Sequence, residues 1–335
     1  MFGATAMKNA LKSIANPFVI RAVSSQNRRI GAVAAAGRRE LDGPSSSSAD
    51  GGPGVRKEEE NGDANIYVKA PGLNVQRKTT SSVTLPTSAA TGSIAGKRFY
   101  EQVSTREAED GNGWSVMLDY RTLRTPSKRP LKLPTLALAE AIAAEWEYQQ
   151  TDGIRPFTMP LMKLACTALE RVPLTRPKII ENLMRKFHQD LVFYRAPGDN
   201  DLTSGVRERQ EEKIDPLLDW VESNFGVKPA VYSSFFGGKQ EDSLMNAIES
   251  LLKNTNDSEL AAIDAIAAAA RSLVIAVGIF RGKLQIEEAI ELIRLEEDLQ
   301  VEKWGLVEGG HDVDIADLKV QISSAAVFLG LSRKL

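Results

Sequence analysis

The sequence contains few of the residues that most often catalyse reactions or bind metals. Of its 335 residues, only Cys166 is a cysteine, and only His188 and His311 are histidines. A single cysteine excludes a disulfide within the chain and a metal site built from paired cysteines. Because Cys166 lies near Ala165 and Ala168 in an apolar segment, we expect a core thiol. We predict neither a metal nor a cofactor.

Long hydrophobic runs are also absent. The most apolar run, residues 273–280, is far shorter than the ~20 residues that a bilayer span requires. We therefore expect no membrane insertion. The N-terminal region also lacks the compact apolar core of roughly 7–15 residues that marks a secretory signal.

Acidic residues are missing from residues 1–39, which contain seven lysines and arginines. This composition is typical of an organelle transit peptide, although a basic tail without an address is the alternative. Most of these basic residues are arginines and the segment has few serines. This composition favours targeting to the mitochondrial matrix over targeting to a plastid or to both. Removing seven positive charges from a net charge of −2 leaves −9 for residues 40–335. An acidic body has no basic surplus to neutralise phosphates, so we expect no binding to nucleic acid.

The remaining chain divides by composition and pattern. Residues 40–96 are rich in Ser, Gly and Thr and read as a disordered low-complexity linker. Residues 97–158 are predicted to form a small β-rich domain with a covering helix. Residues 159–331 are predicted to form a larger, mainly helical domain. The fold class is therefore α+β, with a small N-terminal antiparallel β-rich domain ahead of the helices.

An alternating pattern predicts the strands of an antiparallel meander. Apolar residues alternate over 99–103 and again over 114–118, on either side of the turn signal at 110–113. A third short segment ends at Pro126, and residues 131–133 make a fourth. A sheet of this size needs a covering helix to be stable, and Thr135 is a plausible N-cap for one.

The later segments have helical periodicity. Pro177 is expected to open a helix, and Asp215 with Pro216 is expected to form an N-cap followed by proline at the first helical position. Residues 257–280 are predicted to form one long helix. The other predicted helices span residues 161–171, 241–252, 285–304 and 315–329.

The segment 285–304 contains a carboxylate that is unusual for plain packing. On a helical wheel, Glu297 and Gln300 fall inside the main apolar stripe, which includes Ile286, Ile290, Ile293, Val301 and Trp304. A second apolar patch holds Leu292, Leu295 and Leu299. A carboxylate on an apolar stripe is costly unless it is paired or meets solvent or a partner. Either the helix end is exposed, or an arginine from a neighbouring helix pairs with Glu297, or Glu297 and Gln300 face a binding site.

Short motifs in a fixed order carry a resemblance that covers nearly all of residues 97–330. They are Lys97–Tyr100, Val116–Asp119, Leu123–Pro126, Leu131–Pro134, Ala144–Trp146 with Gln149, Met159-Pro160, Leu164–Ala168, Arg171-Val172, Asp190-Leu191, Tyr194–Ala196, Asp215–Trp220, Glu297 with Gln300, and Trp304-Gly305. Together they resemble the mitochondrial ATP synthase assembly factor 2 family, which handles the alpha subunit of the catalytic sector.

The resemblance implies a matrix chaperone without catalytic activity. Such a protein binds the unassembled alpha subunit, prevents its aggregation, and hands it over to the beta subunit. The resemblance also implies that Glu297, Gln300 and Trp304 bind the partner, because they match a C-terminal motif linked to function. We expect a monomer.

Two other functions are compatible with the residues. One is a matrix enzyme with an acid-lined site on the helical domain, which a pocket with converging acids of perturbed pKa would favour. The other is a stable structural subunit of a matrix complex.

Overall fold

The computed structural model describes residues 82–84, 96–197, 201–233, 238–305 and 311–334. The chain divides into two units, residues 1–74 and 75–335, and every described residue belongs to the second. The predicted transit peptide, residues 1–39, lies outside the described residues. So does the predicted linker, residues 40–96, apart from residues 82–84 and 96.

A small sheet precedes most of the helices. Its strands are β1 (Ser82–Thr84), β2 (Val103–Glu107), β3 (Trp114–Leu118) and β4 (Arg121–Arg124), in the order β1-β4-β3-β2. The β2, β3 and β4 strands are antiparallel, with Thr105 opposite Val116 and Met117 opposite Thr122. These three strands confirm the predicted antiparallel meander, although β2 begins at Val103, the last residue of the segment 99–103 where the first strand was predicted.

Two features of the sheet differ from the prediction. The strand β1, which pairs in parallel with β4, lies in a segment where the composition indicated no element. Residues 131–133 form no strand and contribute one isolated bridge, between Leu133 and Trp114. At the β3–β4 turn, Asp119 has φ 55°. Its Oδ1 accepts hydrogen bonds from the N–H groups of Glu101 and Gln102, which fixes the chain before β2.

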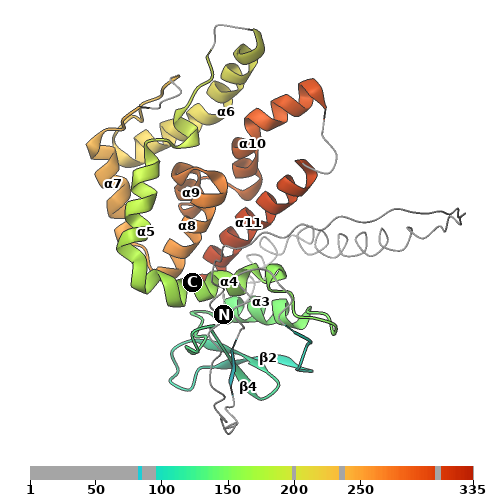
Figure 1. Cartoon of the computed structure of the whole chain (residues 1–335). Coiled ribbons are helices and arrows are strands. Elements are labelled where there is room, and N and C mark those ends of the chain that lie inside the picture. The colour runs from blue at the N-terminus through green and yellow to red at the C-terminus, as the bar shows by residue number, and fades with distance from the viewer. Residues whose placement is uncertain (1–81, 85–95, 198–200, 234–237, 306–310, 335) are drawn as a thin grey trace, which may run out of the picture. The chain divides into compact units, whose positions relative to one another are not determined.

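The helix α3 (Leu136–Glu147) covers the sheet and contacts β2 and β3, as Figure 1 shows. Thr135 caps it as predicted, because its Oγ1 accepts a hydrogen bond from the N–H of Leu138 at 3.1 Å. The buried face of α3 holds Leu138, Ile142 and Trp146, which join the sheet residues in one core. Burying each such side chain contributes roughly 1.5–3 kcal/mol.

In the part of the chain that the structure describes, the regular elements after the sheet are helices (Figure 1). Besides α3, they are η2 (Pro156–Thr158), α4 (Pro160–Cys166), η3 (Thr167–Arg171), α5 (Val172–Phe187), η4 (Leu191–Phe193), α6 (Asp201–Phe225), α7 (Asp242–Lys253), α8 (Asp257–Ala270), α9 (Leu273–Phe280), α10 (Ile286–Trp304) and α11 (His311–Ser332). The α8 helix is central, because it contacts α4, α5, α9 and α11. Its buried alanines allow close approach of neighbouring backbones.

The two expected proline helix starts are wrong. Pro177 lies inside α5, which continues from α4 through the π-helical turn η3. Pro216 lies inside α6, and Asp215 is not a cap. The Asp215 carboxylate instead accepts a hydrogen bond from the buried guanidinium of Arg195. The Asp215 side chain, which the local pattern predicted to cap a helix, therefore forms an ion pair with Arg195 instead.

The predicted single helix over residues 257–280 is two helices. Arg271 adopts a left-handed conformation with φ 52°, and α8 ends there. The Ser272 Oγ then accepts a hydrogen bond from the N–H of Ile275 at 3.0 Å and starts α9. The buried Asp190 Oδ2 accepts bonds from the N–H groups of Leu273 and Val274, at 2.7 and 3.0 Å. The side chains of Ser272 and Asp190 therefore both cap the start of α9 and stabilise the break between α8 and α9. The alanine-rich sequence contains no local sign of this break.

Candidate functional site

The predicted partner-binding residues all lie on α10. The helix begins with a capping box, in which the N–H of Gln285 donates to Glu288 Oε2 at 2.8 Å. It ends at Gly305, which has φ 84°. The predicted helix over 285–304 is thus confirmed.

The face of α10 that enters the core is not the one that the wheel favoured. The second apolar patch, Leu292, Leu295 and Leu299, is buried and makes the main contact, together with Ala289, which lies on the main stripe of the wheel. The isoleucines near Glu297 on the wheel, including Ile290 and Ile293, are only half-buried. The surface that carries Glu297 is therefore open to solvent, and its carboxylate does not enter the core.

The carboxylate of Glu297 is exposed and paired at the same time. Its side chain is 65% exposed, and its Oε2 accepts a hydrogen bond from Arg294 Nη1 at 2.9 Å. Arg294 is only 8% exposed, and its Nη2 donates to Asp298 Oδ1 at 2.6 Å. The expectation of an arginine from a neighbouring helix is therefore wrong, because the pairing arginine lies on α10 itself.

Gln300 and Trp304 lie on the same exposed strip as Glu297. Spacings of three and four residues place all three on one side of the helix. Gln300 is exposed, and Trp304 is 71% exposed, which is unusual for an indole. The structure therefore brings the three predicted residues together on a strip that faces solvent.

Polar side chains that the sequence analysis missed attach α10 to α6. The Gln210 Nε2 donates to Glu296 Oε1 at 2.7 Å, and Arg209 pairs with Glu302 at 2.8 Å. Burial raises the pKa of Glu296, and the bond from Gln210 opposes that shift. No local pattern marks these contacts, because their partners lie nearly ninety residues apart. They hold the C-terminal half of α10 in place.

The next helix, α11, has a second exposed apolar face. Val313, Val320 and Val327 are exposed and seven residues apart, so they lie on one side of the helix. The opposite side buries Ile322 and Leu329, and α11 packs on α8 and α10. The segment 312–332 is long and apolar enough to span a membrane by length and composition, with a mean hydropathy of 1.3. In the structure, one side of this helix packs against protein and the other carries the three valines.

Acids with raised pKa values occur elsewhere, but each has a structural role. Burial raises the pKa of Glu145 to about 8, and its two oxygens cap the start of α4. Burial also raises the pKa of Asp190 to about 6. Asp264, whose pKa is raised by burial, faces Arg171. These groups lie on different elements and do not converge.

This chain and its fold are similar to known proteins. Residues 97–222 match the family model described as ATP12 chaperone protein. The crystal structure of Atp12 from Paracoccus denitrificans superposes with a TM-score of 0.64 at 30% identity, covering 71% of this chain and 99% of that one. The chain belongs to the ATP12 chaperone family.

Other members of the ATP12 family are similar over most of their length. Protein atp12, mitochondrial, from Schizosaccharomyces pombe is 26% identical over 239 residues, which are 69% of this chain and 81% of that protein. Protein ATP12, mitochondrial, from Saccharomyces cerevisiae is 24% identical over 282 residues. The similarity covers 72% of this chain and 86% of that protein. The ATP12 relationship and the solved structure confirm the predicted fold class, a small antiparallel sheet followed by helices.

Proposed function

We propose that this ATP12-family chaperone binds the unassembled alpha subunit of the mitochondrial ATP synthase catalytic sector. In this proposal it prevents aggregation of the subunit in the matrix and hands it over to the beta subunit. Residues 1–39 serve as the mitochondrial transit peptide. The names of the fungal relatives support the mitochondrial address, and the family supports a chaperone role in ATP synthase assembly.

The observation that carries the proposal is the exposed strip of Glu297, Gln300 and Trp304 on α10. Tryptophan is enriched among the residues that dominate interface energies, yet Trp304 is 71% exposed in the isolated chain. Exposed apolar side chains mark interaction sites. We call the strip of Glu297, Gln300 and Trp304 the client face.

The charge arrangement suits a partner that must later leave. Arg294 holds Glu297 in place on the strip that also carries Trp304, so little side-chain freedom of Glu297 is lost on binding. The remaining lone pairs of the exposed carboxylate can accept bonds from a cation on the client. Because the carboxylate stays solvated, the interaction costs little desolvation and is exchangeable.

The test is aggregation of freshly diluted alpha subunit, followed by light scattering, with beta subunit as the control client. We expect the full chain to suppress aggregation of the alpha subunit at a roughly one-to-one ratio. Trp304→Ala should lose most of this protection. Tyr148→Ala is the matched control, because Tyr148 is an aromatic outside the client face that is even more exposed than Trp304.

Adding beta subunit to the protected mixture tests the hand-over. Release of the chaperone with formation of an alpha–beta complex would support it. Co-purification of the chain with finished ATP synthase in a fixed stoichiometry would instead favour a structural subunit. Equal protection by both variants would remove the client face from the proposal.

A further inference from the structure

The helix α10 has two apolar faces, and its surroundings decide which of them meets the core. The first is the isoleucine stripe around Ile286. The second, Leu292, Leu295 and Leu299, lies about 180–240° around the helix axis from Ile286 at roughly 100° per residue. The leucine face is buried, whereas the isoleucines are half-buried and Trp304, on the same stripe, is 71% exposed. Because the stripe is the larger apolar surface, apolar burial alone does not explain why the client face points to solvent.

Polar contacts with the neighbouring helix α6 lie on both edges of the leucine face (Figure 1). On one edge, Gln210 Nε2 donates to Glu296 Oε1 at 2.7 Å. On the other edge, Arg209 pairs with Glu302 at 2.8 Å. On the same wheel, Glu296 lies at about 280° and Glu302 at about 160° from Ile286. Contacts on both edges of one face fix the rotation of α10 about its own axis.

Gln210 is the buried residue among these contacts, because it is only 1% exposed. Its Oε1 accepts a hydrogen bond from the N–H of Ala196 at 2.7 Å, while its Nε2 holds Glu296. The amide thus connects the segment before α6 with α10, and the backbone at Ala196 sets its orientation. A buried, fully bonded polar group adds little net stability, but it specifies one arrangement of two helices against others.

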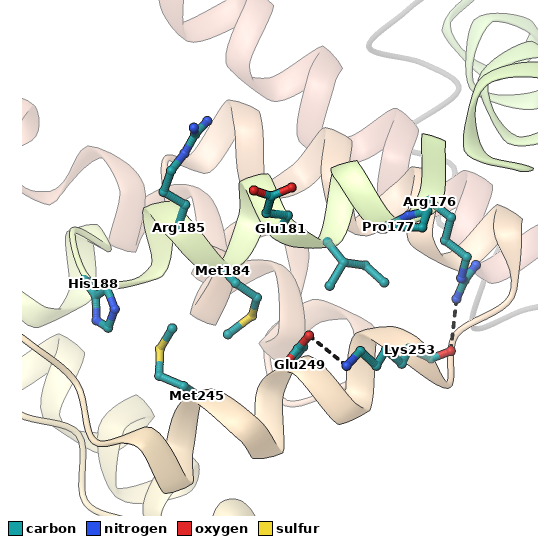
Figure 2. Close-up of a pocket in the computed structure, with 10 residues that line it drawn as sticks. Arg176, Pro177, Glu181, Met184, Arg185, His188, Met245, Glu249 and Lys253 are labelled. Atoms are coloured by element: carbon teal, nitrogen blue, oxygen red, sulfur yellow. Dashed lines mark hydrogen bonds and ion pairs between the residues drawn. The ribbon is translucent and has the colours of Figure 1, made fainter. Parts of the chain in front are cut away.

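The helices α5 and α7 are joined in a different way (Figure 2). Arg176 Nη2 donates to the carbonyl of Lys253 at 3.3 Å, at the C-terminal end of α7. A carbonyl at a helix end is available at any rotation of the helix, so this bond fixes only the position of the end. The groove between these helices has a volume of about 690 Å³, and its lining includes Glu181, Arg185 and Glu249, so its mixed charge selects no partner. A bond to a side chain in the middle of α10, in contrast, forms at one rotation only.

We propose that Gln210 is a positioning residue for the client face. Its bond to Glu296 fixes the rotation of α10 and keeps Glu297 and Trp304 in solvent. Without this bond, the C-terminal half of α10 turns toward its isoleucine side, and the client face is withdrawn. The inference rests on the proposed function of the client face, and it adds the residue that controls how that face is presented.

Gln210→Glu tests the bond with almost no change in shape. The glutamate keeps an acceptor for the N–H of Ala196, but it replaces the donor with a second carboxyl that faces Glu296. Two ionised carboxylates repel each other, and a shared proton removes the repulsion. Relative to wild type at the same pH, the concentration of chain that halves alpha-subunit aggregation should rise at least about fivefold at pH 8 and stay within about twofold at pH 6.

The other charged groups where α6 meets α10 are already paired. They are Arg209 with Glu302, Lys213 with Glu291, and Arg294 with Glu297 and Asp298. Near Ala196, Arg195 pairs with Asp215. Wild type and variant share all these pairs, so a comparison at one pH isolates residues 210 and 296.

Exchanging the two side chains provides the rescue. In Glu296→Gln, the new amide oxygen still accepts from Gln210 Nε2, so protection should stay within about twofold of wild type. In the double variant, Gln210→Glu with Glu296→Gln, the amide at position 296 donates to the carboxylate at position 210, and protection should return at pH 8. Gln150→Glu, at an exposed glutamine after α3, is the matched control and should have no effect at either pH.

Fluorine NMR of the full chain measures the position of the client face without client. The chain carries fluorotryptophan, and the Trp304 resonance is assigned by its loss in Trp304→Phe. Its shift between water and heavy water reports solvent exposure. This solvent shift should fall in Gln210→Glu at pH 8 and recover in the double variant. If circular dichroism shows Gln210→Glu unfolded at pH 8, Glu296→Ala, at a half-buried position, replaces it with the same expected losses.

The two readouts separate the inference from the proposed function. An unchanged Trp304 solvent shift, or a loss of protection that neither pH 6 nor the double variant repairs, would overturn the positioning role and leave the client face in place. A withdrawn Trp304 with full protection of alpha subunit would instead remove the client face from the proposed function.

Discussion

Asp190 offers a test of how the helical part is held together. Its buried carboxylate accepts bonds from the N–H groups of Leu273 and Val274, and also from Val192 at 3.2 Å. Replacing Asp190 with alanine leaves three buried donors without this acceptor. Each unsatisfied donor costs roughly 1–3 kcal/mol. Removing a buried carboxylate whose pKa is raised to about 6 returns roughly 3 kcal/mol near neutral pH. Three donors cost roughly 3–9 kcal/mol together, so we expect Asp190→Ala to lower the free energy of unfolding at pH 7 by about 0–6 kcal/mol, with a central value near 3 kcal/mol.

The pH dependence of this loss sharpens the prediction. Because burial raises the folded pKa of Asp190 above its unfolded value, the wild-type chain gains stability from this group at low pH and loses it as pH rises through about 6. Linkage gives a difference of about 1 kcal/mol between pH 5 and pH 7. The deficit of Asp190→Ala should therefore be about 1 kcal/mol larger at pH 5 than at pH 7.

Urea unfolding followed by circular dichroism at both pH values measures these quantities. Asp219→Ala is the control, because Asp219 is an exposed acid on α6, and its stability change should stay within about 0.5 kcal/mol. A loss below about 1 kcal/mol in Asp190→Ala at both pH values would refute the capping argument. A deficit that grows with pH would refute the raised pKa.

Three further predictions concern other sites. Because burial raises the pKa of Glu145 to about 8, the wild-type chain loses stability as pH rises toward 8, and Glu145→Gln should become more stable relative to wild type over pH 5–8 in urea unfolding. Glu297→Gln should change the free energy of unfolding by less than about 1 kcal/mol, because the pair is exposed and Asp298 remains on Arg294. A larger loss would show a structural role for Glu297. Gly113→Ala should lower the unfolding midpoint, because its Cβ would lie 2.7 Å from a backbone oxygen at φ +120°, whereas Gly330→Ala, in open space on α11, should raise stability by about 0.5–1 kcal/mol.

Local signals in the sequence predicted the elements that depend on local chemistry. Thr135 was predicted as a cap from its position before an apolar periodic run, and the structure confirms its bond to Leu138. The alternating residues of β3 predicted a strand that is half-buried. The periodicity of residues 285–304 predicted α10 with nearly correct ends.

Features set by distant contacts could not be predicted in this way. Asp215 has the local pattern of an N-cap, but Arg195 binds it twenty residues away. The break between α8 and α9 depends on Asp190, which lies over eighty residues earlier in the chain. On α10, a wheel cannot tell which of two apolar patches meets the core, because that depends on where α6 and α11 pack. The partner of Glu297 differs from these cases, because Arg294 lies three residues earlier on α10 and the i,i+3 spacing is a local signal.

The central claim is that the client face contacts the alpha subunit, and site-specific photo-crosslinking tests it directly. An aromatic photoreactive amino acid, which keeps a large ring at the position, replaces Trp304 in one variant and the even more exposed Tyr148 in another. Each variant is irradiated with freshly diluted alpha subunit, and beta subunit serves as the control client. We predict an alpha-subunit adduct from position 304 that is lost when beta subunit is added in excess, and no adduct from position 148. Equal crosslinking from both positions, or an adduct from position 148 alone, would contradict the account.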